Sequence, residues 1–204
     1  MAKRFDEGCR FDGRSQVIIW LVLVAVGVCG RLWQPAYNVT PLAAIALAAG
    51  SVFSSRLAAA AVPLASVMIS NLALLPYDSP WMAAVVSAAI AWPVLLGGLI
   101  RRQGWVAVVG GSLASSLVFF LSTNLAHWAL TQQYPHSPAG LVACFTAALP
   151  FYRWMPVGDL GWSLIVFAGL AAAGRVGSSG RFGRFAPAVI RRDEQAAEAE
   201  QSLD

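Results

Sequence analysis

Long apolar stretches separated by short polar ones dominate the chain. A helix needs about 20 residues to cross a hydrocarbon core of about 30 Å. Six stretches are long enough, and a seventh, with 14 residues, is in the range of a re-entrant or interfacial segment. The pattern predicts an all-α integral membrane protein, a six-helix transmembrane bundle with a short re-entrant or interfacial segment before the last helix. The six spans are 15–30, 39–55, 57–76, 81–100, 104–123 with an extension to 130, and 157–174, and the short segment is 137–150.

Charged residues lie almost entirely outside these stretches. Asp, Glu, Lys and Arg make up 12% of the 204 residues, against about 25% in an ordinary soluble domain. Residues 1–14 hold seven of them, residues 175–204 hold ten, and the whole stretch between holds seven. This distribution excludes a soluble enzyme, a nucleic-acid-binding protein and a disordered chain. It divides the chain into an N-terminal segment 1–14, a transmembrane bundle 15–174 and a basic-then-acidic tail 175–204. We expect the basic part of the tail to lie on anionic membrane lipid and its acidic end to be solvated, rather than a specific docking site.

The placement of Lys and Arg predicts the orientation of the bundle. With six spans, twelve basic residues lie on the side of the two termini, and only Arg31 and Arg153 lie on the other side. If residues 137–150 also crossed, this split would fall to eight and six. Because basic residues in short loops stay on the cytoplasmic side, we expect both termini in the cytoplasm. We interpret residues 15–30 as a retained first helix, since no small-residue cleavage site follows them.

This orientation places the polar side chains of the membrane domain at its outer end. Asn38 and Thr40 precede the second span, where they act either as helix caps or as groups that face a ligand. Asn71 lies near the outer end of the third span. An amide in hydrocarbon needs a polar partner, so Asn71 bonds another helix or faces a cavity.

A second polar group lies at the outer end of the fifth span. His127 and Trp128 follow Asn124 by three and four residues, so the three share one helix face if the helix continues. Together with Tyr134 in the following loop, they are candidates for the wall of a ligand pocket. The alternative is an interfacial Trp belt with a hydrogen-bonded histidine.

Small residues line one face of the second span. Ala44 and Ala48 form one small-xxx-small pair, and Ala46 and Gly50 form another. Such pairs let helix backbones approach closely in a membrane. Packing within the bundle and docking of a partner helix are both compatible with the pattern.

Catalytic and metal-binding motifs are missing from the sequence. His127, His136 and Cys144 are spaced nine and eight residues apart, which fits no standard ligand motif. We therefore expect no metal and no cofactor, and no enzyme activity, because an organised nucleophile and base are missing. Asp78 and Asp159 are single carboxylates at or beside loops, and we expect Asp159 to pair with Arg153 or to cap the last helix.

Four segments carry a resemblance to a family of uncharacterised small bacterial membrane proteins. They are NVTPLAAIALAAGSVF from residue 38, VPLASVMISNLAL from residue 62, FFLSTNLAHW from residue 119, and YPHSPAGLVACFTAALPF from residue 134 with GDL after it. The match covers residues 37–174. That family is similar to the membrane-embedded, substrate-binding S-components of energy-coupling-factor vitamin transporters, and it usually carries an acidic residue where this chain has Asn71.

The resemblance implies a protein of the bacterial inner membrane that captures a vitamin-like small molecule from the outer side. We expect the outward pocket to be formed by the polar residues named above, namely Asn38, Thr40, Asn71, Asn124, His127, Trp128 and Tyr134. A transmembrane coupling protein would dock on Ala44 and Ala48, and a separate ATPase would supply energy, because this chain has no phosphate-binding loop. Cobalamin is not implied, because residues 76–92 contain no cysteine to ligate cobalt. The alternative function is a structural or assembly subunit of a larger membrane complex.

Overall fold

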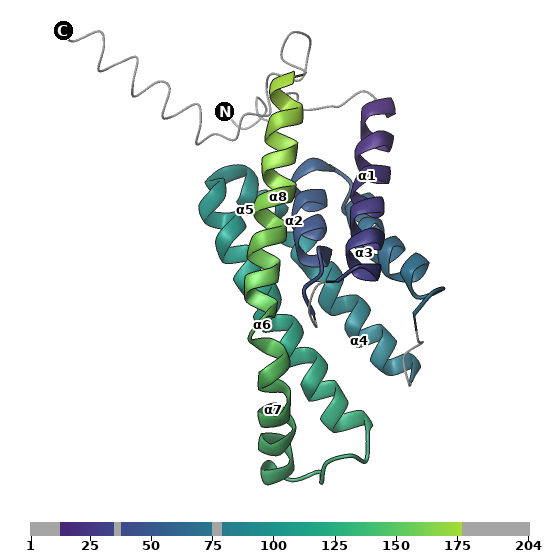
Figure 1. Ribbon diagram of the computed structural model, residues 1–204, viewed down its shortest axis with the longest axis vertical. Coiled ribbons are helices and arrows are strands. Elements are labelled where there is room, and N and C mark those ends of the chain that lie inside the picture. The colour runs from purple at the N-terminus through teal and green to yellow at the C-terminus, as the bar shows by residue number, and fades with distance from the viewer. Residues whose placement is uncertain (1–12, 35–37, 75–78, 177–204) are drawn as a thin grey trace, which may run out of the picture.

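A computed structural model describes residues 13–34, 38–74 and 79–176, and every regular element in these ranges is a helix (Figure 1). The expected tail 175–204 and N-terminal segment 1–14 lie almost wholly outside the described residues, as does Asp78. The elements are α1 (Gly13–Leu32), α2 (Leu42–Val52), α3 (Arg56–Ser70), α4 (Pro80–Ala91), the 3-10 helix η1 (Trp92–Leu96), α5 (Gly97–Gln103), α6 (Trp105–Leu130), α7 (Pro138–Tyr152) and α8 (Met155–Val176).

Four helical stretches are long and apolar enough to cross a membrane. They are Arg14–Leu32, Pro80–Gln103, Trp105–Leu130 and Met155–Ala173, the second being the continuous run of α4, η1 and α5. The described chain is thus compatible with a helical membrane protein, but it contains four such stretches and not the six full spans that were predicted. Helices α2 and α3 have only 11 and 15 residues. Helix α2 is short because it starts after Pro41 and ends where Phe53 adopts an extended conformation.

The predicted short segment 137–150 corresponds to α7. Helix α7 runs in the same direction as α8 and is joined to it by a turn at Arg153 and Trp154 (Figure 1). It also packs against the last turns of α6, where the ring of Phe120 lies 5.5 Å from that of Phe145 and 4.5 Å from that of Tyr152. Residues 137–150 are therefore not a re-entrant segment. They form a helix that pairs with the end of α6 as a hairpin and leads directly into α8.

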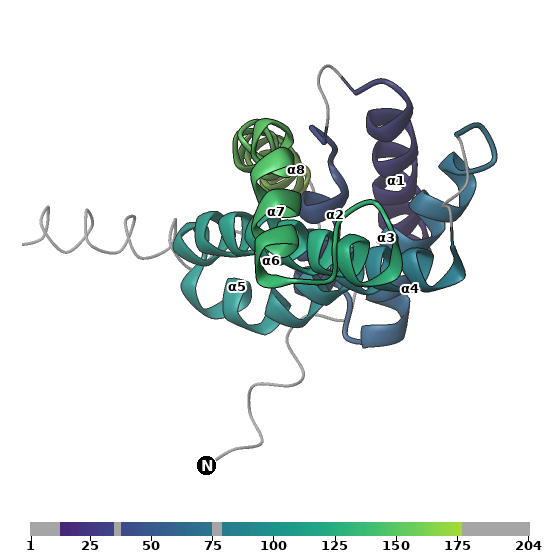
Figure 2. The same cartoon turned by 90° about the horizontal axis from the view of Figure 1, so that it is seen from below.

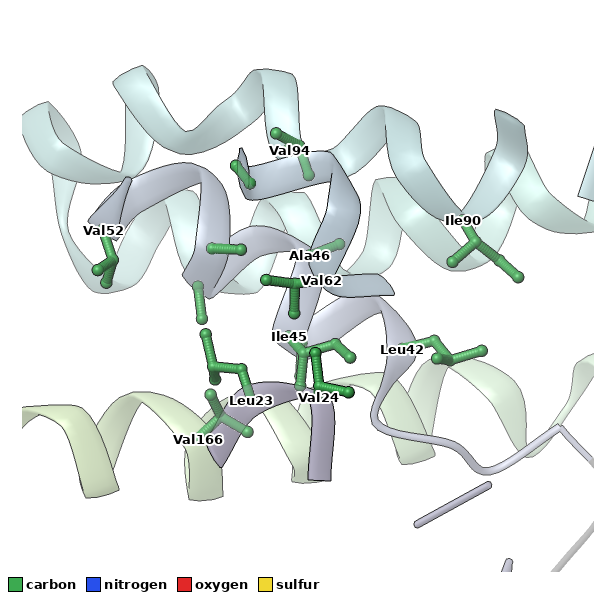
Figure 3. Packing of buried hydrophobic residues seen from close by; sticks show 14 of the residues in the cluster. Leu23, Val24, Leu42, Ile45, Ala46, Val52, Val62, Ile90, Val94 and Val166 are labelled. Atoms are coloured by element: carbon green, nitrogen blue, oxygen red, sulfur yellow. The ribbon is translucent and has the colours of Figure 1, made fainter. Parts of the chain in front are cut away.

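Helix α2 forms the centre of the bundle. Viewed along the bundle, it lies between α8 on one side and α1 and α3 on the other (Figure 2). Side chains from α1, α3, η1 and α8, among them Val24, Val62, Val94 and Val166, form one buried cluster with those of α2 (Figure 3). Ala44 and Ala48 are fully buried in this packing. The small-residue face is therefore used within the chain, and it offers no surface on which a partner helix could dock.

Two glycines bring α2 and the α4–α5 run into backbone contact. A Cβ atom added to Gly97 would collide with the carbonyl of Gly50, and one added to Gly50 would collide with the carbonyl of Val94. Because neither clash involves a flexible side chain, the crossing of these helices requires glycine at both positions.

Serine hydroxyls link the outer helices in pairs. Ser66 of α3 donates to the carbonyl of Val24 in α1 at 3.3 Å. Ser112 of α6 donates to the hydroxyl of Ser163 in α8 at 2.7 Å. These bonds fix the register of α1 on α3 and of α6 on α8 without burying an unpaired polar group.

Candidate functional site: a polar pocket at one end of the bundle

A cavity of about 240 Å³ lies among α1, α2, α4, α6 and α8. Its wall is mostly apolar, with a few polar side chains, which is typical of sites for small molecules. The lining residues are Arg31, Gln34, Asn38, Thr40, Leu42, Ala43, Leu74, Val86, Ala89, Ile90, Pro93, Ser115, Phe119, Met155 and Asp159.

Helical periodicity places two pairs of these side chains in the wall between α6 and α8. Ser115 and Phe119 are four residues apart on α6, and Met155 and Asp159 are four residues apart on α8. Residues at this spacing lie one above the other on a helix face. The wall therefore presents a hydroxyl, an aromatic ring, a thioether and a carboxyl group to the same cavity.

Asp159 is the most deeply buried charged residue of the pocket, with 3% of its surface exposed. Its Oδ2 atom accepts a hydrogen bond from the hydroxyl of Ser116 at 2.6 Å. The prediction that it pairs with Arg153 or caps α8 is wrong, because Asp159 lies inside α8 one turn after its start. Arg153 is exposed, and its guanidinium lies 5.3 Å from the ring centre of Trp154.

Arg31 contributes the second charge, from the last turn of α1. Its Nη1 atom donates to Ser70 Oγ and Asn71 Oδ1, both at 2.6 Å, and to the carbonyl of Val67 at 3.2 Å. The expectation that Asn71 bonds another helix is met in this contact. Arg31 lines the cavity and Asn71 does not. Asn71 therefore contributes indirectly, by accepting a hydrogen bond that holds Arg31 against α3.

Asn38 and Thr40 both line the pocket from the loop before α2. Asn38 has a φ angle of 62°, a left-handed conformation that Asn tolerates better than most residues. Neither residue caps α2, whose N-cap is Pro41 and lacks a side-chain hydrogen bond. The capping expectation is therefore wrong. Both residues line the cavity, and a ligand-binding role for them stays a prediction.

The other four predicted site residues lie apart from this cavity, in the hairpin of α6 and α7. Asn124 donates to the carbonyl of Phe120 at 2.8 Å, Trp128 donates to the carbonyl of Pro135 at 3.0 Å, and His127 is hydrogen-bonded to Gln133 at 2.9 Å. The ring of Tyr134 lies 6.3 Å from that of His127. These contacts close the hairpin loop, and a ligand-binding role for the group stays a prediction.

Cys144 lies on the buried side of the same hairpin, where its thiol donates to the carbonyl of Asn124 at 3.6 Å. In the described part of the chain, no three His, Cys, Asp or Glu side chains converge as metal ligands would.

The sequence analysis missed Arg31 and Asp159 as pocket residues. Both are among the few charges between residues 15 and 174, and that rarity was a usable signal, because an ionisable group within an apolar helix is costly and marks a functional site. Ser112, Ser115 and Ser116 share one face of α6 and gave a second signal. Neither signal identifies Ser116 as the hydrogen-bond partner of Asp159, because the two residues are 43 positions apart in the sequence.

The fold and the pocket define a helical protein of membrane type with a small, mostly apolar cavity that contains two charged side chains. Residues 11–179 match a family of unknown function, DUF6580, and the chain belongs to this family. Searches of curated proteins and of solved structures each gave no match.

Proposed function

We propose that this protein captures a small molecule in the pocket beside Arg31 and Asp159. The observation that carries the proposal is the cavity itself, whose apolar walls surround a few polar groups from different elements. The cavity also contains the buried carboxyl group of Asp159, and a polar group in an apolar environment costs free energy unless it has partners.

The proposal includes an orientation in the bacterial inner membrane with both termini in the cytoplasm. The imbalance of twelve basic residues against two supports it. Gln34, Asn38, Thr40 and Leu74 line the pocket from the α1–α2 and α3–α4 connections, which in this orientation lie on the outer side. The captured molecule therefore enters from outside the cell.

The resemblance to vitamin-transporter S-components supports uptake of a vitamin-like molecule, with a transmembrane coupling protein and a separate ATPase as partners. Because Ala44 and Ala48 are fully buried, a coupling protein would contact another part of the surface. Exposed apolar side chains such as Leu117 and Leu121 on α6 provide such a surface.

Mass spectrometry of small molecules retained by gently purified protein tests the proposal. The pocket variant combines Asn38→Gly, which keeps the left-handed backbone, with Thr40→Val, which keeps the side-chain volume. The control variants are Asn124→Ala and Trp128→Ala in the hairpin. We expect a compound at near-equal stoichiometry in the wild type, a loss of affinity of about tenfold in the pocket variant from two missing hydrogen bonds, and retention in both controls.

The other outcomes are equally informative. Loss of the compound from the hairpin variants alone would move the site to the α6–α7 hairpin. Purification of lipid alone, together with a stoichiometric protein partner, would contradict capture and favour a structural or assembly subunit.

A further inference from the structure

The carboxyl group of Asp159 has one hydrogen bond in the described structure. The donor is Ser116, which contacts Oδ2, and no other described residue donates to the second oxygen, Oδ1. The side chain is 3% exposed and lines the cavity. A carboxylate in an apolar environment is stable only with hydrogen-bond donors or a cation beside it, so the cavity leaves a position for a group that supplies them.

The neighbours of Asp159 in the wall have the chemistry that favours a cation. Phe119 offers an aromatic ring, whose face attracts positive charge, and Met155 offers a polarisable thioether. Neither side chain can donate a hydrogen bond to a carboxylate. An occupant of the cavity that carries a hydrogen-bond donor or a positive charge would complete the interactions of Asp159.

The other charge of the pocket is already held by α3. Arg31 directs Nη1 to Val67, Ser70 and Asn71. Its guanidinium is thus anchored on a different helix from the one that carries Asp159. Both charged side chains line the same cavity.

We infer that the ligand carries a cationic nitrogen, a protonated amine or a quaternary ammonium group, which binds at Asp159 between Phe119 and Met155. The inference rests on the proposed function, because it specifies the ligand of the same pocket. The apolar residues of α4, Val86 and Ile90, contact the uncharged part of this ligand, and Asn38 and Thr40 bind its polar groups.

Competitive retention on purified protein in lipid nanodiscs tests the inference. The probe is a defined mixture of cationic, neutral and anionic vitamins and amines, which includes choline and its uncharged isostere dimethylbutanol. Wild type, Asp159→Asn, Phe119→Leu and the pocket variant Asn38→Gly with Thr40→Val are compared, and Asn124→Ala is the control. Asn keeps the size of Asp and an oxygen that accepts from Ser116, so Asp159→Asn is the least disruptive way to remove the charge.

We expect wild type to retain cationic compounds and to prefer choline to dimethylbutanol. Asp159→Asn is expected to reduce the affinity for the retained cation by about 30-fold or more, because a buried charge partner is removed. Phe119→Leu is expected to reduce it by about 3- to 10-fold without changing the retention of neutral compounds. The latter variant tests the same site if Asp159→Asn does not fold.

Two results separate the inference from the proposed function. If wild type retains a neutral or anionic compound that the pocket variant loses, or if Asp159→Asn and Phe119→Leu keep the cation unchanged, the inference is wrong and capture stands. If wild type retains no compound from the mixture or from the cell, both are wrong.

Discussion

In two places an arginine side chain donates hydrogen bonds to carbonyl groups at the C-terminal end of a helix. Arg31 reaches the carbonyl of Val67 near the end of α3, and Arg101 reaches the carbonyls of Gly50 and Ser51 at the end of α2. The last four carbonyls of a helix have no partner within it, and a cation there also interacts with the helix dipole. In an apolar bundle these bonds replace those that water would make.

The contact of Arg101 predicts a clear difference between two adjacent arginines. Arg101 Nη1 lies 2.8 Å from the Gly50 carbonyl oxygen and 3.2 Å from that of Ser51. We expect Arg101→Ala to lower the free energy of unfolding by about 1 to 2 kcal/mol. Arg102→Ala is the control, since Arg102 is also exposed and donates neither bond. Thermal unfolding of the detergent-solubilised variants measures both, and equal midpoints would show that the carbonyl contacts add no stability.

Among the elements, α2 decides how the others assemble. It is only 11 residues long, yet nearly all of its residues are buried. Seven other elements, α1, α3, α4, η1, α5, α6 and α8, pack around it, and this packing depends on the absence of side chains where the backbones cross. The small residues that suggested a docking face are therefore buried in contacts within the bundle.

Because α2 and the α4–α5 run cross with their backbones in contact, we expect a single added methyl group at the crossing to lower the stability strongly. Gly97→Ala places a Cβ atom against the backbone of Gly50, and we expect it to lower the free energy of unfolding by about 2 kcal/mol or more. Gly110→Ala on α6 is the matched control, because nothing lies within 4 Å of its added Cβ atom. Its stability should stay the same or rise by up to about 1 kcal/mol through helix propensity. Similar unfolding midpoints for the two variants would contradict the close crossing.

At the scale of the whole molecule, the helical runs alternate in direction. Helix α1 begins and α8 ends at the same end of the bundle, while the hairpin of α6 and α7 extends at the other end (Figure 1). Helices α7 and α8 have 15 and 22 residues, and at 1.5 Å per residue they extend over about 55 Å. This exceeds a hydrocarbon core of about 30 Å, so part of this column projects beyond the membrane.

The orientation predicts opposite locations for two reporters. A reporter fused after Gly174 is expected in the cytoplasm, and one inserted between Gln132 and Gln133 in the hairpin loop is expected outside. Alkaline phosphatase and a fluorescent protein at each site distinguish the two compartments. Reporters on the same side would show that α7 and α8 do not carry the chain across the membrane, and a reversal of both would invert the proposed entry side of the pocket.

The sequence by itself determined the class of the molecule and much of its local structure. Apolar runs and confined charges predicted an all-helical membrane-type chain, and the order of the apolar runs put Asn38 and Thr40 among the candidate pocket residues. These features depend on the chain's own composition and on the 3.6-residue period of a helix.

Only the tertiary structure decided which helices meet and in what register. It joined Asp159 to Ser116, placed Asn71 behind Arg31 and separated the hairpin residues Asn124 and Trp128 from the pocket. It also shortened α2 and buried its small-residue face. The reason is that helical spacing fixes which side chains share a face, whereas contacts between helices depend on how closely their backbones cross, which is a property of the packed bundle as a whole.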